Sequence, residues 1–183
     1  MKKFLKTNGL LIGLATFIVF IDQLTKVLVR QNLTLGETWM PWKWLEPYAR
    51  IVHWQNTGAA FGIFQNANLI LMILSIIVSI AIVIYYQKVD PKDLLGRIAI
   101  SMQFGGALGN LVDRIKLGHV TDFISVGNFP VLNIADACVT VGVSLLVLSI
   151  LLQERKTALL HKEAKLTEQP VIEKAANDEH QTD

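Results

Sequence analysis

Two aspartates in the second half of the sequence have the residue type and the surroundings for acid–base chemistry. Asp122 and Asp136 each lie in an apolar stretch, and neither has a lysine or arginine within four positions. Two carboxyl groups that lie close together cannot both ionise easily, so one keeps its proton while the other is charged. The protonated group can act as an acid, and the ionised group can take a proton from water to create a nucleophile. The residues alone leave two interpretations open: a pair that hydrolyses a peptide bond without a metal, or separate capping and hydrogen-bonding roles.

Other polar side chains lie at the edges of apolar stretches. Asp22 and Lys26 are four residues apart, so on a helix they face the same way and are predicted to form an ion pair. This pair either only neutralises its two charges or supports a site. Asn110, Asp113 and Arg114 are spaced so that all three can share one helix face. They either cap the end of an apolar helix or belong to a site.

The composition is that of a membrane protein. Of the 183 residues, 52% are hydrophobic and only 17% are charged, where about a quarter is usual in soluble domains, and the mean hydropathy is +0.43. A bilayer core needs roughly 20 apolar residues per helix. We therefore predict a mainly α, integral membrane protein with four transmembrane helices, at residues 9–28, 68–86, 98–112 and 134–152. The third is short and glycine-rich, and the GxxxG spacing of Gly105 and Gly109 predicts close helix packing.

The distribution of basic residues predicts the orientation of these helices. Lysines and arginines gather before the first helix, between the second and third, and after the fourth. By the positive-inside rule these regions, and both termini, lie in the cytoplasm. We predict a membrane domain at residues 1–153 and a polar, partly disordered tail at 154–183. No small-residue cleavage site follows the first helix, so we do not interpret it as a cleaved signal peptide. The net charge of +2 gives no reason to expect a nucleic-acid partner.

The segment between the first two helices is predicted to lie on the outer face. It contains all four tryptophans, a residue that prefers the membrane interface. Residues 49–55 are bulky and β-branched, and Asn56 then opens a predicted turn, Asn-Thr-Gly. Asn56 either only shapes this turn or offers a donor and an acceptor to an extended peptide. We predict a small β-structured element at about residues 30–66, and a plain aromatic anchor belt is compatible with it.

Five short motifs in this chain resemble the motif set of bacterial lipoprotein signal peptidase, signal peptidase II. They are DQLTK at 22–26, NTGAAFG at 56–62, GNLVDR at 109–114, VTDF at 120–123 and NIAD at 133–136. The motifs come in order and in register with the four predicted helices, and the resemblance covers residues 10–152.

The resemblance implies a fold, a substrate and residue roles. The fold is a four-helix membrane protein with an external β-cradle, located in the bacterial cytoplasmic membrane with its active site near the outer face. The enzyme removes the signal peptide from prolipoproteins, cutting before a diacylglyceryl-modified cysteine, and globomycin-type inhibitors are expected to block it. No cofactor or metal is implied. Asp122 and Asp136 would be the catalytic pair. The residues expected to bind substrate or to support that pair are Asn56, Asn110, Arg114, Asn133, Asp22 and Lys26.

Two other classes of function are compatible with intramembrane charge. A small transporter or proton channel would use such residues along an ion path, but here the charges gather near one surface. A scaffold subunit would explain the glycine face of the third helix. It would not explain two aspartates without basic neighbours.

Overall fold

The structure is a computed structural model that describes residues 2–58 and 67–179. Side chains are described for residues 8–58 and 67–161. The chain separates into two compact units, Met1–Leu146 and Val147–Asp183. Part of the NTGAAFG motif, residues 59–62, lies outside the described residues.

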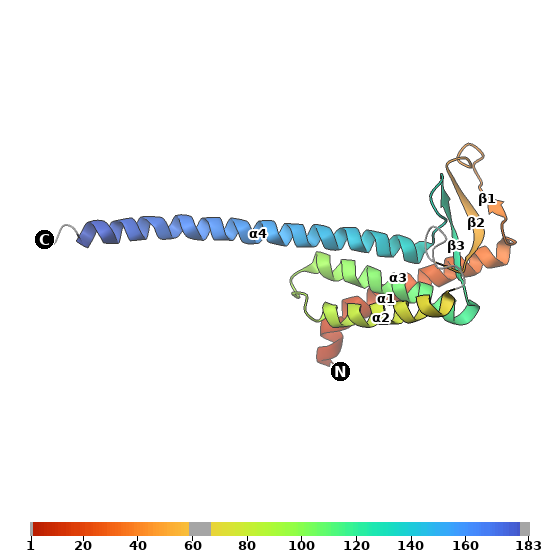
Figure 1. Ribbon diagram of the computed structural model, residues 1–183, viewed down its shortest axis with the longest axis horizontal. Helices are drawn as coiled ribbons and strands as arrows, with labels where there is room; N and C mark the ends of the chain where they lie inside the picture. The colour runs from red at the N-terminus through yellow and green to blue at the C-terminus, as the bar shows by residue number, and fades with distance from the viewer. Residues whose placement is uncertain (1, 59–66, 180–183) are drawn as a thin grey trace. The chain divides into compact units, whose positions relative to one another are not determined.

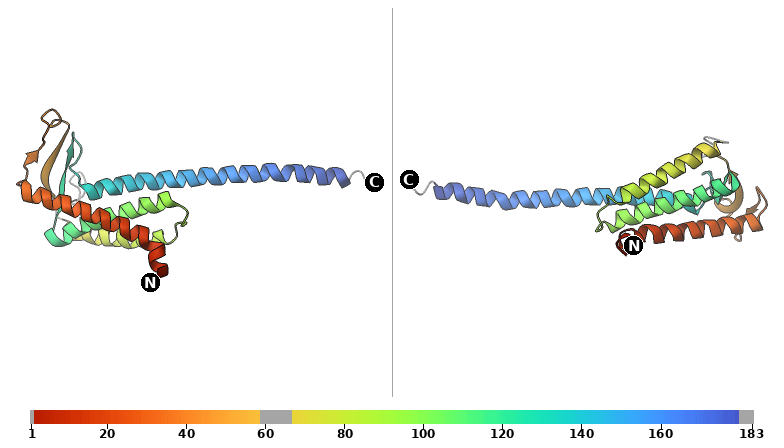
Figure 2. Two further views of the ribbon diagram at one scale, coloured as in Figure 1. Left: turned by 180° about the vertical axis from the view of Figure 1, so that it is seen from behind. Right: turned by 90° about the horizontal axis from the view of Figure 1, so that it is seen from below.

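Three helices of the first unit lie side by side, with α3 in the middle (Figures 1 and 2). They are α1 (Lys2–Asn32), α2 (Asn68–Tyr86) and α3 (Leu94–Leu117). Helix α3 begins where the Asp93 carboxylate accepts a hydrogen bond from the Gly96 backbone N–H at 2.9 Å, and thereby caps an open end. It ends at Gly118, whose φ of 76° is a left-handed conformation that glycine adopts without steric cost.

Helix α4 (Ile134–Glu179) belongs to both units. Its first part packs on α3 through glycines. A Cβ on Gly142 would come within 2.7 Å of the Ala99 carbonyl oxygen, so only a glycine allows this approach. In the second unit the helix continues to Glu179. The predicted domain boundary after residue 153, and partial disorder of the tail, stay predictions.

A small antiparallel sheet stands at one end of the helices, with its strands in the order β1-β2-β3 (Figure 1). The strands are β1 (Thr38–Trp39), β2 (Ala49–Asn56) and β3 (Val120–Val126). The predicted β-structured element is therefore present, but the prediction for residues 30–66 missed its third strand, which comes from the segment between α3 and α4. Residues of β2 pair with β3 in a register that sets Trp54 opposite Asp122. This register joins two distant parts of the chain at the first aspartate.

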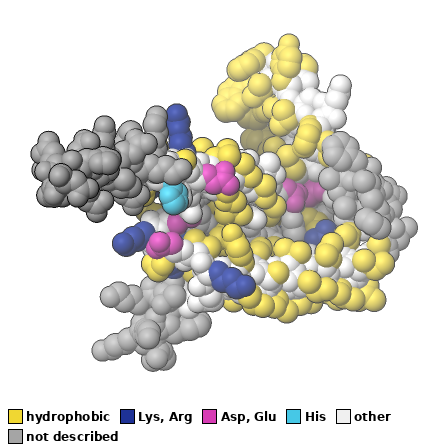
Figure 3. Space-filling view, turned by 60° about the vertical axis from the view of Figure 1, so that its left-hand side comes forward, with side chains coloured by type: hydrophobic (Ala, Val, Ile, Leu, Met, Phe, Trp, Pro, Cys, Tyr) yellow, Lys and Arg dark blue, Asp and Glu magenta, His cyan; other side chains and the backbone are white. Residues whose placement is uncertain are grey.

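Within the described residues, three helical segments are long and apolar enough to cross a membrane: Asn8–Asn32, Asn68–Tyr86 and Ile134–His161. Many large apolar side chains on them are exposed, and Figure 3 shows apolar side chains spread over one face, interrupted by polar and charged ones. A helix with a wide exposed apolar surface fits a lipid environment. Helix α3 is not among these segments, so the prediction of four membrane spans is only partly supported.

Candidate active site

Asp122 and Asp136 come from different elements and share hydrogen-bonding partners. Asp122 lies in the middle of β3 with 1% of its surface exposed, and Asp136 lies half-buried in the first turn of α4. Asn133 connects the two. Its side-chain Nδ2 donates to Asp122 Oδ1 at 2.6 Å, and its backbone N–H approaches Asp136 Oδ2 at 3.4 Å.

The same asparagine also starts α4. The Asp136 backbone N–H donates to Asn133 Oδ1 at 2.9 Å. With the reverse contact from the Asn133 N–H to the Asp136 carboxylate, this is the reciprocal arrangement of a capping box, here formed by asparagine and aspartate. Helix initiation and the position of the second aspartate therefore depend on one local motif.

Two further asparagines each donate to one carboxylate. Asn110 Nδ2 donates to Asp136 Oδ1 at 2.7 Å, and Asn56 Nδ2 donates to Asp122 Oδ2 at 2.9 Å. Asn110 is also joined to Asn133, whose Nδ2 lies 3.1 Å from Asn110 Oδ1. The three asparagines come from β2, α3 and the start of α4, and their amides link the two aspartates into one network.

Burial and mutual repulsion change the acidity of Asp122. The pKa of Asp122 is raised to about 7, mainly by burial and to a smaller extent by the nearby charge of Asp136. Hydrogen bonds from Asn56 and Asn133 and the charge of Lys26 act in the opposite direction. A carboxyl group with a pKa near neutrality can both hold and release a proton at physiological pH, as acid–base catalysis requires.

A buried charge cluster lies beneath this network. Asp22 and Lys26 form the predicted ion pair within it. Lys26 Nζ lies 2.8 Å from Asp22 Oδ2 and 3.3 Å from Asp113 Oδ2, and all three side chains are at most 1% exposed. Lys26 Nζ also donates to Asn110 Oδ1 at 2.9 Å. Through Asn110 this lysine is therefore connected to Asp136.

The structure shows how two further residues support the site: Asp113, for which the sequence left helix capping and a site role both open, and Gln23, to which the sequence gave no role. Asp113 accepts the Thr121 backbone N–H at 3.0 Å, and so holds β3 one residue before Asp122. Gln23 donates to Asp113 Oδ1 at 3.0 Å and to the Gly109 carbonyl oxygen at 3.1 Å. A glutamine inside an apolar helix, next to Asp22, was a signal that could have identified Gln23.

Glycines allow the helices to approach closely enough to build this cluster. A Cβ on Gly109 would lie 2.7 Å from Asp22 Oδ2, and one on Gly106 would clash with the Ala135 carbonyl oxygen. In the space so created, Asp22 Oδ1 accepts the Ala135 backbone N–H at 3.0 Å. The predicted close packing of the glycine face is confirmed, and it positions a helix start that carries Asp136.

A cavity of about 360 Å³ opens onto the network. Its polar lining includes Asn56, Asn110, Asp136 and Arg114, and its remaining walls are mostly apolar. Arg114 Nη2 lies 3.4 Å from the Gly58 carbonyl oxygen. Of the predicted site residues, the structure thus brings the three asparagines into contact with the aspartates and places Arg114 on the cavity wall.

The sequence matches the family model for signal peptidase II over residues 14–152. The chain belongs to the signal peptidase II family. Membership in a peptidase family decides against the transporter and scaffold alternatives.

Similar proteins agree with this assignment. Lipoprotein signal peptidases of Staphylococcus aureus strains JH9 and Newman are each 36% identical over 147 residues, which is 78% of this chain and 88% of theirs. Two solved structures, each described as a bacterial membrane enzyme, are 35% identical with TM-scores of 0.73 and 0.70. They cover 78% of this chain and 88% and 93% of their own.

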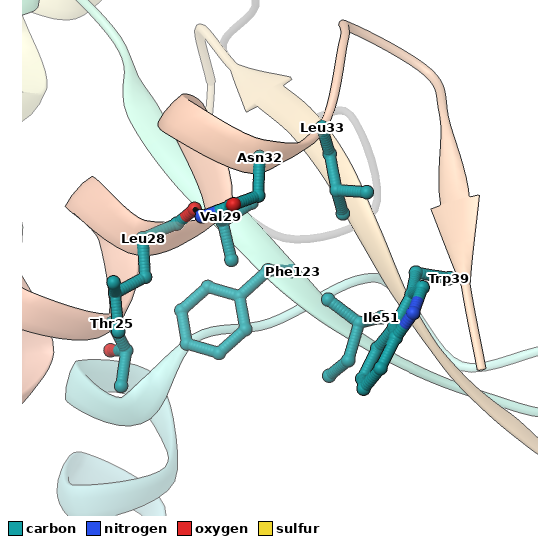
Figure 4. A pocket seen from close by; sticks show the side chains of 8 residues that line it. All are labelled: Thr25, Leu28, Val29, Asn32, Leu33, Trp39, Ile51 and Phe123. Atoms are coloured by element: carbon teal, nitrogen blue, oxygen red, sulfur yellow. Dashed lines mark hydrogen bonds between the residues drawn. The ribbon is translucent and has the colours of Figure 1, made fainter. Parts of the chain in front are cut away.

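The chain also has an apolar cavity beside β3 (Figure 4). It measures about 460 Å³ and is lined by Thr25, Leu28, Val29, Asn32, Leu33, Trp39, Ile51 and Phe123. Successive side chains of a strand point to opposite faces, so Phe123 faces away from the side that Asp122 faces. Thr25 Oγ1 and Asn32 Nδ2 donate to carbonyl oxygens of α1. The lining therefore offers contacts mainly to hydrocarbon.

Proposed function

We propose that this chain is an aspartic endopeptidase that removes the signal peptide from diacylglyceryl-modified prolipoproteins. It cuts immediately before the lipid-modified cysteine. The observation that carries the proposal is the network in which three asparagines join Asp122 to Asp136. Three of its members, Asn56, Asn110 and Asp136, line a cavity. The substrate class is supported by the name of the Staphylococcus aureus relatives, lipoprotein signal peptidase.

The two aspartates perform the hydrolysis while sharing one proton. The ionised carboxylate takes a proton from a water molecule as the water oxygen attacks the carbonyl carbon of the scissile bond. The protonated carboxyl donates to the substrate, and the carbon–nitrogen bond breaks with the amine leaving as a neutral group. Water has then been added across the bond, and the pair again holds one proton. The raised pKa of Asp122, about 7, is what allows one proton to be shared at neutral pH.

Asn56, Asn110, Asn133 and Arg114 hold the substrate and the pair in register. The three amide side chains donate to the carboxylates, and so fix the direction in which each carboxylate faces. Amide and guanidinium groups at a cavity wall can also bind a peptide backbone, a contact that does not discriminate between substrate side chains. Asp22 and Lys26 support Asn110 from beneath. A globomycin-type cyclic peptide would compete with substrate for the same cavity.

We further propose that α3 is a fourth membrane span, that both termini are cytoplasmic and that the sheet lies at the outer face. Helix α3 has 24 residues, which corresponds to about 36 Å and exceeds the roughly 30 Å of a bilayer core. Its polar residues Arg97, Ser101 and Asp113 are buried, so it does not need an apolar surface all round. The basic residues between α2 and α3 support the orientation.

The test is cleavage of a purified prolipoprotein, with and without the diacylglyceryl group, by the full chain in lipid nanodiscs. We expect cleavage of the lipidated form alone, with a mass that places the cut before the modified cysteine. Asp122→Asn should leave the precursor intact, while Asp90→Asn, the same change at an exposed site between α2 and α3, should leave cleavage unchanged. Equal cleavage of both precursors would exclude the proposed substrate class, and activity of Asp122→Asn would exclude the proposed pair.

A further inference from the structure

A groove separate from the aspartate cavity lies on the surface of the helices, and the two share no lining residue. The groove measures about 360 Å³ and runs between α1 and α3. It extends along α1 from Val19 to Arg30, which is roughly 16 Å of helix. Its apolar walls include Phe20 and Leu24, which are 61% and 43% exposed. Side chains of this kind on a membrane-facing helix contact hydrocarbon.

The end of the groove near the sheet carries two cations. Arg30 lies in the last turn of α1 and Lys116 in the last turn of α3, and both line the groove. Lys116 is exposed, and within the described residues it forms no ion pair. The one acidic residue of the lining, Asp113, is 1% exposed and bonded to Lys26. The open surface of this end is therefore positive.

Arg30 has hydrogen-bonding capacity that its described contacts do not use. Its Nη1 donates to Thr121 Oγ1 at 2.8 Å and lies 3.9 Å from Asp113 Oδ1. Within the described residues its Nη2 and Nε form no hydrogen bond and no ion pair, and the side chain is 24% exposed. A guanidinium group can bind an additional oxyanion through such a free edge.

An apolar groove that ends in two cations matches the chemistry of one kind of molecule. A phospholipid presents a hydrocarbon chain and, at the membrane interface, a phosphate. We propose that this groove binds an anionic phospholipid, with an acyl chain against Phe20 and Leu24 and the phosphate between Arg30 and Lys116. Because Arg30 also holds Thr121, the residue before Asp122, the bound phosphate lies close to the strand that carries the first aspartate.

The proposal is tested by native mass spectrometry of the full chain in detergent, titrated with phosphatidylglycerol or phosphatidylcholine of identical acyl chains. We expect phosphatidylglycerol to bind more tightly. Lys116→Gln should weaken phosphatidylglycerol binding about five-fold, the effect of one basic residue near an anionic lipid, and should leave phosphatidylcholine unchanged. Lys43→Gln removes the same charge from an exposed site between β1 and β2, and should have no effect. Arg30 is kept, since it also contacts Thr121.

A second pair of variants tests the acyl-chain site. Phe20→Ala should weaken binding of both lipids, whereas Phe17→Ala, also 61% exposed on α1 but outside the groove, should not. Equal affinity for the two lipids, or equal effects of Lys116→Gln and Lys43→Gln, would overturn the proposal. Displacement of the lipid by soluble glycerol 3-phosphate at equal concentration would also overturn it, because the groove walls would then contribute nothing. The readout is independent of peptidase activity.

Discussion

Replacement of Lys26 by methionine is the most informative perturbation of the buried charge cluster. Methionine keeps the length of the side chain and removes its charge. The variant leaves Asp22 and Asp113 together, at 0% and 1% exposure, without their shared cation. It also removes the hydrogen bond from Lys26 Nζ to Asn110. The free energy of unfolding and the pKa of Asp122 should therefore change together.

The structure gives the scale of both effects. Removing one partner of a buried ion pair costs about 3–5 kcal/mol, because the remaining charge is left uncompensated. For a protein of this size the midpoint of thermal unfolding should fall on the order of 10 °C. Lys26 also lowers the pKa of Asp122, so its loss should raise that pKa above 7. The limb of the cleavage–pH profile that reports this carboxyl should shift to higher pH.

The assay is thermal unfolding of the detergent-solubilised full chain together with the pH dependence of cleavage. Lys43→Met is the matched control, since this lysine is exposed, and it should change stability by less than about 0.5 kcal/mol. Lys26→Met combined with Asp22→Asn should recover part of the loss, because one unpaired charge is removed as well. A Lys26→Met variant as stable as the control, or a double variant with simply additive losses, would refute this account of the cluster.

Three further predictions concern packing, pH and the tryptophan segment. Gly109→Ala should destabilise the protein by about 1–3 kcal/mol, because the new Cβ would lie 2.7 Å from Asp22 Oδ2. In Gly13→Ala the new Cβ meets no atom within 4 Å, so the stability should not change. Chemical unfolding of the two variants gives the comparison. Folding raises the pKa of Asp122 from 3.8 to about 7, so the stability linked to this group is complete below pH 4 and is lost as pH rises through 7. The free energy of unfolding of Asp122→Asn should therefore exceed that of wild type by up to about 4 kcal/mol at pH 8 and by nothing at pH 4. Chemical unfolding at the two pH values measures the difference. The exposed Trp39, Trp42 and Trp44, between α1 and α2, are expected to cover the lipid end of the substrate. Alanine at all three positions should then reduce turnover, and unchanged turnover would refute this role.

Much of the helical fold follows from local sequence pattern. The uncharged stretch at residues 68–86 matches α2 in both bounds. A single apolar segment in lipid must satisfy its own backbone hydrogen bonds, and a helix does so. The third predicted helix, at 98–112, was too short. Leu94–Leu117 is helical because the Asp93 cap and Gly118 define its ends, and apolarity alone did not reveal these positions.

The third strand could not be predicted in the same way. Val120–Val126 is apolar and short, and its partner β2 lies about 70 residues earlier, so only tertiary pairing makes it a strand. The prediction that Asp122 and Asp136 form a pair rested on their apolar surroundings and the absence of basic neighbours, which do not show how the two meet. Asn133 and Asn110, which hydrogen-bond to each other and to one carboxylate each, provide the physical link.

Buried polar contacts were the least predictable part of the site. The four-residue spacing was enough to predict the pairing of Asp22 with Lys26, because helix geometry alone brings these side chains together. The contacts of Gln23 and Asp113 cross between α1, α3 and β3, and depend on the close approach allowed at Gly109. No local pattern encodes such contacts.

The central claim is that Asp122 and Asp136 act as one catalytic unit. Its most direct test is single-turnover cleavage of a lipidated precursor by three variants: Asp122→Asn, Asp136→Asn and the double variant. Each single change should reduce the rate by at least about 10³-fold, and the double change should cause no further loss, since the pair fails when either member is lost. Retention of most of the rate in either single variant, or losses that multiply in the double variant, would contradict the claim.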